Sequence, residues 1–171
     1  MDGGVPMEVD AVLLDAFDRI RGLVPAVVDG LDEDQLAARP GGTANSIAWL
    51  VWHLSRIQDD HIAGVAGAGQ LWHTGGWADR FDLDLDPDDT GYGHGPADVA
   101  KVRAPAALLA GYHDAVADRT DEFVRGLSAP DLDRVVDTHW NPPVTLGVRL
   151  ISIVSDCLQH VGQAAYARGL E

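Results

Sequence analysis

Residues 151–163 read ISIVSDCLQHVGQ, and this stretch is the strongest indication of the fold class in the sequence. Its apolar side chains recur at spacings of three and four, which predicts part of a buried helix over about residues 145–167. Asp156 and His160 stand four residues apart, so their side chains project from one face of that helix. Because a carboxylate in apolar surroundings must be hydrogen-bonded, paired or coordinated, this pair predicts a polar site inside the fold.

A second apolar helix carries a residue that can complete this site. Residues 46–65 read SIAWLVWHLSRIQDDHIAGV and are almost continuously apolar around His53. If this helix is a neighbour of 145–167, His53 joins Asp156 and His160 in a set of two histidines and one carboxylate. Three protein ligands leave coordination positions free for water or substrate, as they do in catalytic metal sites.

Simpler explanations exist for each of these residues. A lone histidine on a buried helix is more often a hydrogen-bonded core residue than a ligand, and carboxylate–histidine pairs four residues apart are common in helices. Spacing alone therefore leaves structural and metal-binding roles open for His53, Asp156 and His160. His61 lies two turns beyond His53, is rotated away from it and is expected on the solvated surface. Cys157 points to another face than Asp156 and is expected to be a small core residue.

Two further amphipathic segments complete the expected architecture. Residues 8–28 and a segment over about residues 105–126 place apolar side chains at helical spacings. We found no convincing alternating pattern of the kind that predicts a strand. The sequence therefore predicts an all-α protein, a four-helix bundle forming a single domain over residues 1–171.

The connections between these helices differ in length. Residues 31–42 form a connector that has room for one short turn of helix before Pro40. Residues 67–104, between the second and third helices, have no sustained period but are rich in aromatic side chains. A loop this long inside a domain is usually functional or poorly ordered, and the aromatic residues favour a packed loop. We expect short helical turns within it near 77–81 and 97–101.

The charge and cysteine content of the chain limit the partners and the compartment that we expect for it. The 171 residues include 12 basic and 27 acidic side chains, and the formal charge of −15 would repel a phosphate backbone or an anionic membrane. We therefore expect neither nucleic-acid nor membrane binding. Cys157 is the only cysteine, which excludes an internal disulfide, and the first ten residues lack the features of a secretory signal. A cytoplasmic protein is the expectation.

Several motifs in this chain resemble those of a known superfamily. WHLSRIQDDH at 52–61 and DCLQHVGQAAYARG at 156–169 resemble the metal-dependent four-helix bundles of the DinB-like superfamily. The branch that looks most similar is that of the actinobacterial mycothiol-dependent S-transferases and maleylpyruvate isomerase-like proteins. GGWADRF at 75–81 and TGYGHGP at 90–96 resemble the segment between helices in that branch.

The resemblance extends to individual residues of the predicted site. In that superfamily the metal ligands are one histidine on the second helix and a pair four residues apart on the last helix, followed by Gly-Gln. His53, Asp156, His160 and Gly162-Gln163 match this pattern. The carboxylate at 156 is typical of the mycothiol-using branch, whereas many other members have histidine there. Gln163 lies one turn beyond His160 and is expected to support the site.

The resemblance implies a metal-dependent mycothiol S-transferase in which His53, Asp156 and His160 are the catalytic, metal-binding residues. The metal would convert the thiol into a thiolate, which would attack an electrophilic small molecule. Zinc is the first choice because it accepts mixed nitrogen, oxygen and sulfur ligands, while nickel, manganese and iron stay open.

Aromatic and polar residues of the long loop are candidates for binding the thiol. Mycothiol carries sugar and inositol rings, for which flat aromatic faces and hydrogen-bonding side chains are suitable partners. The candidates are Trp77, Arg80, Tyr92 and His94. Packing of the loop, or exposure at the surface, is the simpler role for each of them.

Two other functions stay open at this stage. The same ligand set suits another metal-dependent enzyme, such as a hydrolase that uses metal-bound hydroxide or an isomerase. Alternatively, the bundle binds a metal without chemistry, for stability or within a homodimer.

Overall fold

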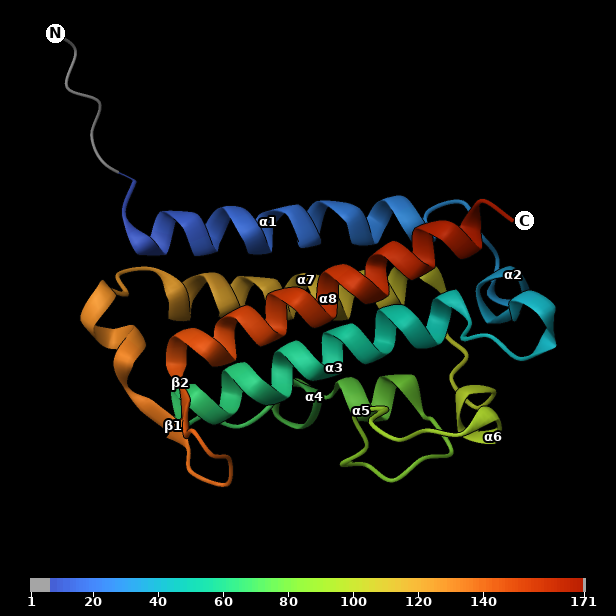
Figure 1. The fold of residues 1–171 in the computed structure, drawn as a ribbon. Coiled ribbons are helices and arrows are strands. Elements are labelled where there is room, and N and C mark those ends of the chain that lie inside the picture. The colour runs from blue at the N-terminus through green and yellow to red at the C-terminus, as the bar shows by residue number, and fades with distance from the viewer. Residues whose placement is uncertain (1–6, 171) are drawn as a thin grey trace, which may run out of the picture.

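Four long helices form the body of the protein in a computed structural model that describes residues 7–170. They are α1 (Val9–Val28), α3 (Ile47–Ala66), α7 (Ala106–Val124) and α8 (Leu146–Arg168). Each has two long neighbours, so that the order around the bundle is α1, α8, α3, α7 (Figure 1). The predicted all-α four-helix bundle is confirmed.

The direction of the helices explains the lengths of the connections. In Figure 1, α1 and α8 run one way while α3 and α7 both run the other way. A chain that leaves the end of α3 must return to the opposite end of the bundle before α7 can begin. The long segment between α3 and α7 is this return crossover, which explains why it cannot be a short loop.

Capping residues mark the ends of the two helices that carry the predicted site. The Ser46 side chain accepts a hydrogen bond from the backbone of Trp49 at the start of α3, and Gly67 ends that helix with a left-handed backbone. Thr145 caps α8 in the same way as Ser46 caps α3. The caps fix the ends of these helices, and α3 and α8 pack as antiparallel neighbours (Figure 1).

Short elements fill the connections. α2 (Glu33–Ala37) and the 3₁₀ turn η1 (Pro40–Gly42) lie between α1 and α3, and the crossover contains α4 (Leu71–Thr74), α5 (Trp77–Phe81) and α6 (Pro96–Val99). α5 lies where a turn was predicted and α6 lies close to the other predicted turn, whereas α4 was not expected. The crossover is ordered because Trp72, Phe81 and Val99 are buried in the core.

A small hairpin precedes α8 and was not predicted from the sequence. The 3₁₀ turn η2 (Ala129–Asp133) leads into β1 (Val135–Asp137), which pairs antiparallel with β2 (Val144–Thr145). Strands of three and two residues are too short to show an alternating pattern, so periodicity could not reveal them. Among the helices of residues 7–170, none has the length and apolar character needed to span a membrane.

Candidate metal centre between α3 and α8

The structure brings together the three residues that the sequence singled out. His53 comes from α3, whereas Asp156 and His160 come from adjacent turns of the neighbouring α8. Each offers one potential ligand atom, and these atoms lie within 4.8 Å of one another. The imidazole rings of His53 and His160 meet edge to face, with centroids 4.6 Å apart. The predicted convergence is confirmed.

Hydrogen bonds to backbone carbonyls hold both imidazole rings. His53 Nδ1 lies 2.5 Å from the carbonyl oxygen of Thr90, and His160 Nδ1 lies 2.8 Å from that of Asp156. A carbonyl oxygen can only accept, so each Nδ1 is the protonated nitrogen and donates. The lone pair of each Nε2 is therefore free, which is the tautomer that a metal ligand requires.

The Asp156 carboxylate is the group whose hydrogen bonding is incomplete. Its Oδ2 is buried and makes no hydrogen bond, although it lies 3.3 Å from His160 Nδ1. Burial acts to raise the pKa of Asp156, but the nearby His160 and His53 hold this pKa below its ordinary value. A charged, buried oxygen to which none of the described residues donates a hydrogen bond, beside two free imidazole nitrogens, fits a divalent cation well.

The two histidines have opposite pKa shifts. Burial lowers the pKa of His53 below its usual value and outweighs the hydrogen bond to Thr90, which acts in the opposite direction. Burial also acts against protonation of His160, but the neighbouring Asp156 raises its pKa overall. Near neutral pH, His53 is therefore the more readily available of the two imidazoles for binding a metal ion.

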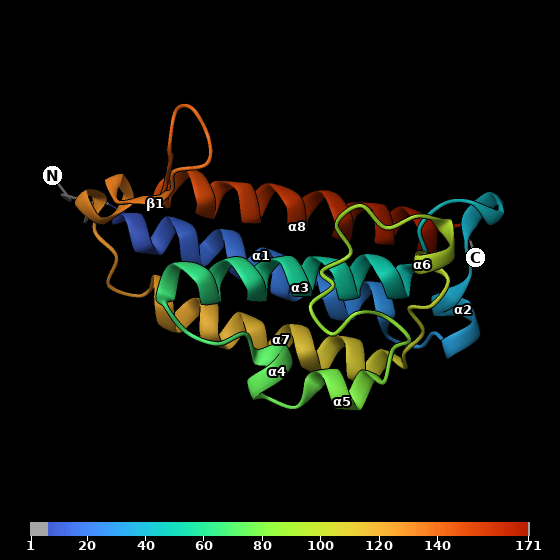
Figure 2. The same ribbon diagram turned by 90° about the horizontal axis from the view of Figure 1, so that it is seen from below.

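A loop of the crossover, around residues 87–90, accepts hydrogen bonds from His53 and from two other buried side chains. Three buried side chains donate hydrogen bonds to nearby carbonyls of this loop: Trp72 to Pro87 at 3.0 Å, Arg56 to Asp89 at 3.0 Å, and His53 to Thr90. Figure 2 shows this segment, between α5 and α6, crossing the face of α3. These hydrogen bonds therefore attach the crossover to the bundle at the position of His53.

Gly91 lets this loop approach His53 closely. Its φ is +92°, and a Cβ atom placed there would lie 2.6 Å from His53 Nδ1 and 3.1 Å from atoms of Trp49 and Trp52. No side chain fits in that space without moving the imidazole. Sequence reasoning missed this role, although the glycine-rich run TGYGHGP at 90–96 was a signal that the backbone comes close to another group.

Of the four candidate thiol-binding residues, Trp77 and Arg80 lie away from this centre, whereas Tyr92 and His94 belong to the loop that contacts His53. Arg80 lies over the ring of Trp77, 3.9 Å from its centroid, on the side of the bundle where α5 packs against α7. Tyr92 is 90% exposed. His94 is buried behind the site, where its Nδ1 accepts a hydrogen bond from Trp49 Nε1 at 3.2 Å. Trp49 in turn stacks on the His53 ring, and thereby links His94 to the site.

Other predictions about single residues have mixed outcomes. Cys157 is buried in the core, and burial raises the pKa of its thiol. It is therefore a core residue, as predicted. His61 was expected on the solvated surface, but it is half-buried between Asp60 and Arg149, because α8 and the hairpin cover that side of α3. Gln163 is exposed beside the site.

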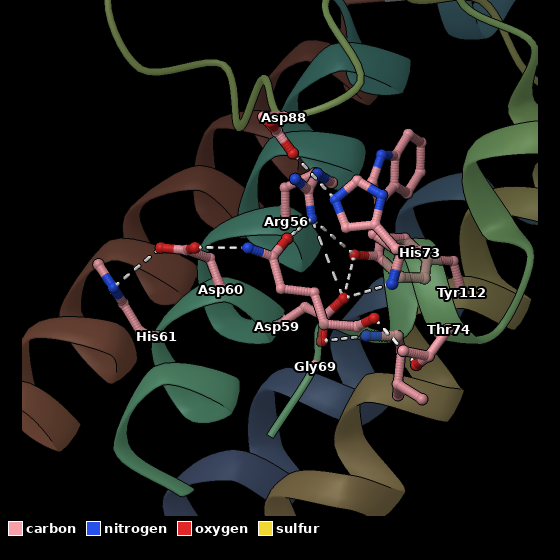
Figure 3. Close-up of polar contacts among 12 residues, drawn as sticks. Arg56, Asp59, Asp60, His61, Gly69, His73, Thr74, Asp88 and Tyr112 are labelled. Carbon is pink, nitrogen blue, oxygen red and sulfur yellow. Dashed lines mark hydrogen bonds and ion pairs between the residues drawn. The ribbon is translucent and has the colours of Figure 1, made fainter. Parts of the chain in front are cut away.

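A second polar cluster on α3 was not predicted. Arg56 and Asp59 are both completely buried, and Figure 3 shows them beside Tyr112. Arg56 donates to Gln70 at 2.7 Å, whereas the Asp59 carboxylate accepts from the Tyr112 hydroxyl at 2.8 Å and from two backbone amides of α4 at 2.7 and 2.9 Å. The presence of Arg56 and Asp59 in an apolar helix was a signal of this cluster.

Comparisons with known proteins agree with this arrangement. A family model described as mycothiol-S-transferase matches residues 12–170. A solved structure of a conserved protein from Enterococcus faecalis is 30% identical, has a TM-score of 0.88, and is aligned over 95% of this chain and 96% of its own. No curated protein matches the chain. Because the family model covers all four long helices and the crossover, the chain belongs to the mycothiol-S-transferase family.

Proposed function

We propose that this protein joins mycothiol, through its sulfur, to an electrophilic carbon of a small molecule, with a divalent metal ion held by His53, Asp156 and His160. The observation that carries the proposal is the buried, unpartnered Oδ2 of Asp156 beside two imidazoles whose Nδ1 atoms are already engaged. Membership of the mycothiol-S-transferase family supports mycothiol as the thiol. Zinc suits this ligand set, and nickel, manganese and iron are the alternatives to be tested.

The bound metal would lower the pKa of the thiol, about 8.5 when free, so that the sulfur is a thiolate at neutral pH. In the overall reaction a sulfur–carbon bond forms, the bond from carbon to the leaving group breaks, and the leaving group keeps the electron pair. The thiol proton passes to water.

The chain itself holds the ligands in place. The carbonyl oxygens of Thr90 and Asp156 fix the tautomer and orientation of the two imidazoles. The ring of Trp49 covers one face of His53, with an interplanar angle of 14°. These contacts are made within the protein, so the ligands are preorganised.

Metal content and thiol-dependent turnover test this proposal together. Protein loaded with each candidate metal is assayed for conjugation of mycothiol to a chromogenic electrophile, with thiol-free reactions run in parallel. His160→Ala should lose bound metal and turnover while staying folded. His73→Ala is the matched control, because His73 is a half-exposed histidine outside the centre, paired with Asp88.

Three outcomes would contradict the proposal. If the metal-loaded protein consumes the electrophile equally fast with and without thiol, it is a hydrolase and not a transferase. If His160→Ala binds metal as tightly as His73→Ala does, then the centre is not the metal site. Tight metal binding with no turnover on any electrophile would favour a non-enzymatic metal-binding bundle.

A further inference from the structure

A hollow with a volume of about 540 Å³ lies next to the candidate metal centre. It is formed by the start of α3, the last turns of α8 and the connector around η1. Leu50 lines it three residues before His53, and Gln163 lines it three residues after His160. The hollow therefore begins one helical turn from the metal ligands on both helices.

The lining of this hollow is apolar and uncharged. Its large apolar residues are Leu50, Leu158 and Tyr166, and three amide side chains, those of Asn45, Gln159 and Gln163, supply polar groups. Of the described residues that line it, none carries a charge. This is unusual in a chain with 27 acidic and 12 basic residues, and it means that a bound anion would have no cation as a partner.

Neither arginine near this end of the bundle can serve as that cation without breaking existing contacts. Arg39 donates hydrogen bonds to the backbone carbonyls of Thr43, Ala44 and Pro96, at 2.7 to 2.9 Å. Arg168 donates to two carbonyls at the end of α1, at 2.8 and 3.1 Å. Both guanidinium groups therefore hold the connections in place.

From this geometry we propose that the hollow receives the electrophile and that the electrophile is an uncharged, largely apolar molecule with one or two groups that accept hydrogen bonds from the amides. The proposal rests on the proposed thiol transfer. The thiol itself is a poor fit, because the hydroxyl groups of its sugar and inositol rings would lose their hydrogen bonds to water against Leu50 and Leu158. A halogenated nitroarene represents the expected class of substrate.

Two electrophiles that differ only in charge test the substrate class. Chlorodinitrobenzene and its carboxylated analogue, chlorodinitrobenzoate, both release chloride when a thiolate attacks, and each rate is divided by its uncatalysed rate. We expect kcat/KM for the neutral compound to be at least about tenfold higher, because the carboxylate would lose part of its hydration against an uncharged lining without gaining a cation as a partner. Equal values for the two compounds would overturn the proposal.

Substitutions in α8 test whether the electrophile binds in the hollow. Leu158→Arg adds a cation to the hollow and should reduce the preference for the neutral compound about tenfold. Ile151→Arg is the matched control, because Ile151 is also an exposed apolar residue of α8, seven residues earlier, and lies outside the hollow. Gly162→Leu should fill the hollow and weaken binding of the neutral compound, since no atom lies within 4 Å of a Cβ placed there. An equal shift in Ile151→Arg and Leu158→Arg would overturn the location.

Binding of unreactive analogues separates this proposal from the proposed function. Calorimetry with dinitrotoluene and dinitrobenzoate requires no turnover. If dinitrotoluene binds wild type and Ile151→Arg but not Leu158→Arg, the hollow is a site for neutral ligands even in a protein that transfers no thiol. If neither analogue binds, the assignment is wrong. If sedimentation shows a dimer that both arginine variants dissociate, this face is an interface between copies and the proposal fails.

Discussion

Helix α3 contributes to two polar clusters, through His53 in one and through Arg56 and Asp59 in the other, and the two clusters differ in how completely the hydrogen bonds of their carboxylates are satisfied. In the inner cluster, the Asp59 carboxylate accepts three hydrogen bonds and lies beside Arg56, and no part of either side chain is exposed (Figure 3). In the candidate metal centre, Asp156 Oδ2 has no hydrogen-bond partner and the side chain is 32% exposed.

The difference shows how a carboxylate that is satisfied within the fold can be distinguished from one that is available to a ligand. Both clusters contain ionisable groups on apolar helices, which the sequence displays equally clearly. Only the structure shows that Asp59 joins α3, α4 and α7 through its own acceptors, whereas Asp156 keeps an unused acceptor beside two free imidazole nitrogens. The first cluster stabilises the crossover, and the second has the capacity to bind a ligand.

The largest expected effect is on stability and comes from the inner cluster. Asp59→Ala leaves the buried Arg56 without its carboxylate and should reduce the free energy of unfolding by about 3–5 kcal/mol. Urea denaturation measures this, and Asp88→Ala, at an exposed aspartate of the same crossover, is the control. A loss as small as that of the control would mean that the inner cluster contributes little to stability.

A third buried polar contact on α3 should make the fold sensitive to acid. His113 is fully buried with Nδ1 3.2 Å from the Ser55 hydroxyl, and burial lowers its pKa to about 4. The unfolded chain takes up this proton near pH 6.5, so stability should fall by about 3 kcal/mol between pH 6.5 and 4, with no further loss from this group below pH 4. Urea denaturation across this range measures the effect, and His113→Gln should show a correspondingly shallower decline. An unchanged pH dependence in His113→Gln would contradict the assignment.

The close contact between Gly91 and His53 predicts an effect of residue 91 on metal affinity. Gly91→Ala should weaken metal binding about 10–100-fold, because the added Cβ displaces the imidazole that the Thr90 carbonyl orients. Gly93→Ala is a close control: this glycine lies in the same loop and also has a positive φ, but no atom lies within 4 Å of a Cβ there. Competition with a metal chelator measures both affinities, and equal losses would mean that backbone strain alone is responsible.

The smallest expected effect on stability comes from the candidate metal centre. Asp156→Asn should change the free energy of unfolding of the metal-free protein by no more than about 1 kcal/mol, because Oδ2 has no hydrogen bond to lose and the contact with His160 is partly exposed. The same variant should lose metal binding. Chemical denaturation and metal titration of one preparation measure both, and a loss as large as that of Asp59→Ala would place Asp156 in a structural role.

Much of the fold and the central part of the site could be predicted from local patterns. The apolar spacing of the four long segments predicted the bundle, because a helix buries one face at a fixed period. His53, Asp156 and His160 were recognisable as polar residues on apolar helices, and their convergence needed only that α3 and α8 be neighbours. Short elements such as α4 and the hairpin were beyond this reasoning, since a few residues show no period.

Patterns within one or two turns of the chain predicted which long segments are helical and which residues have ligand chemistry. The fold then showed that Asp59 is satisfied while Asp156 is not, and that Gly91 lies against His53. It also showed that His94 accepts a hydrogen bond from Trp49. These outcomes depend on contacts between residues far apart in the chain, and the energy of a buried polar group is set by the partners that folding brings to it.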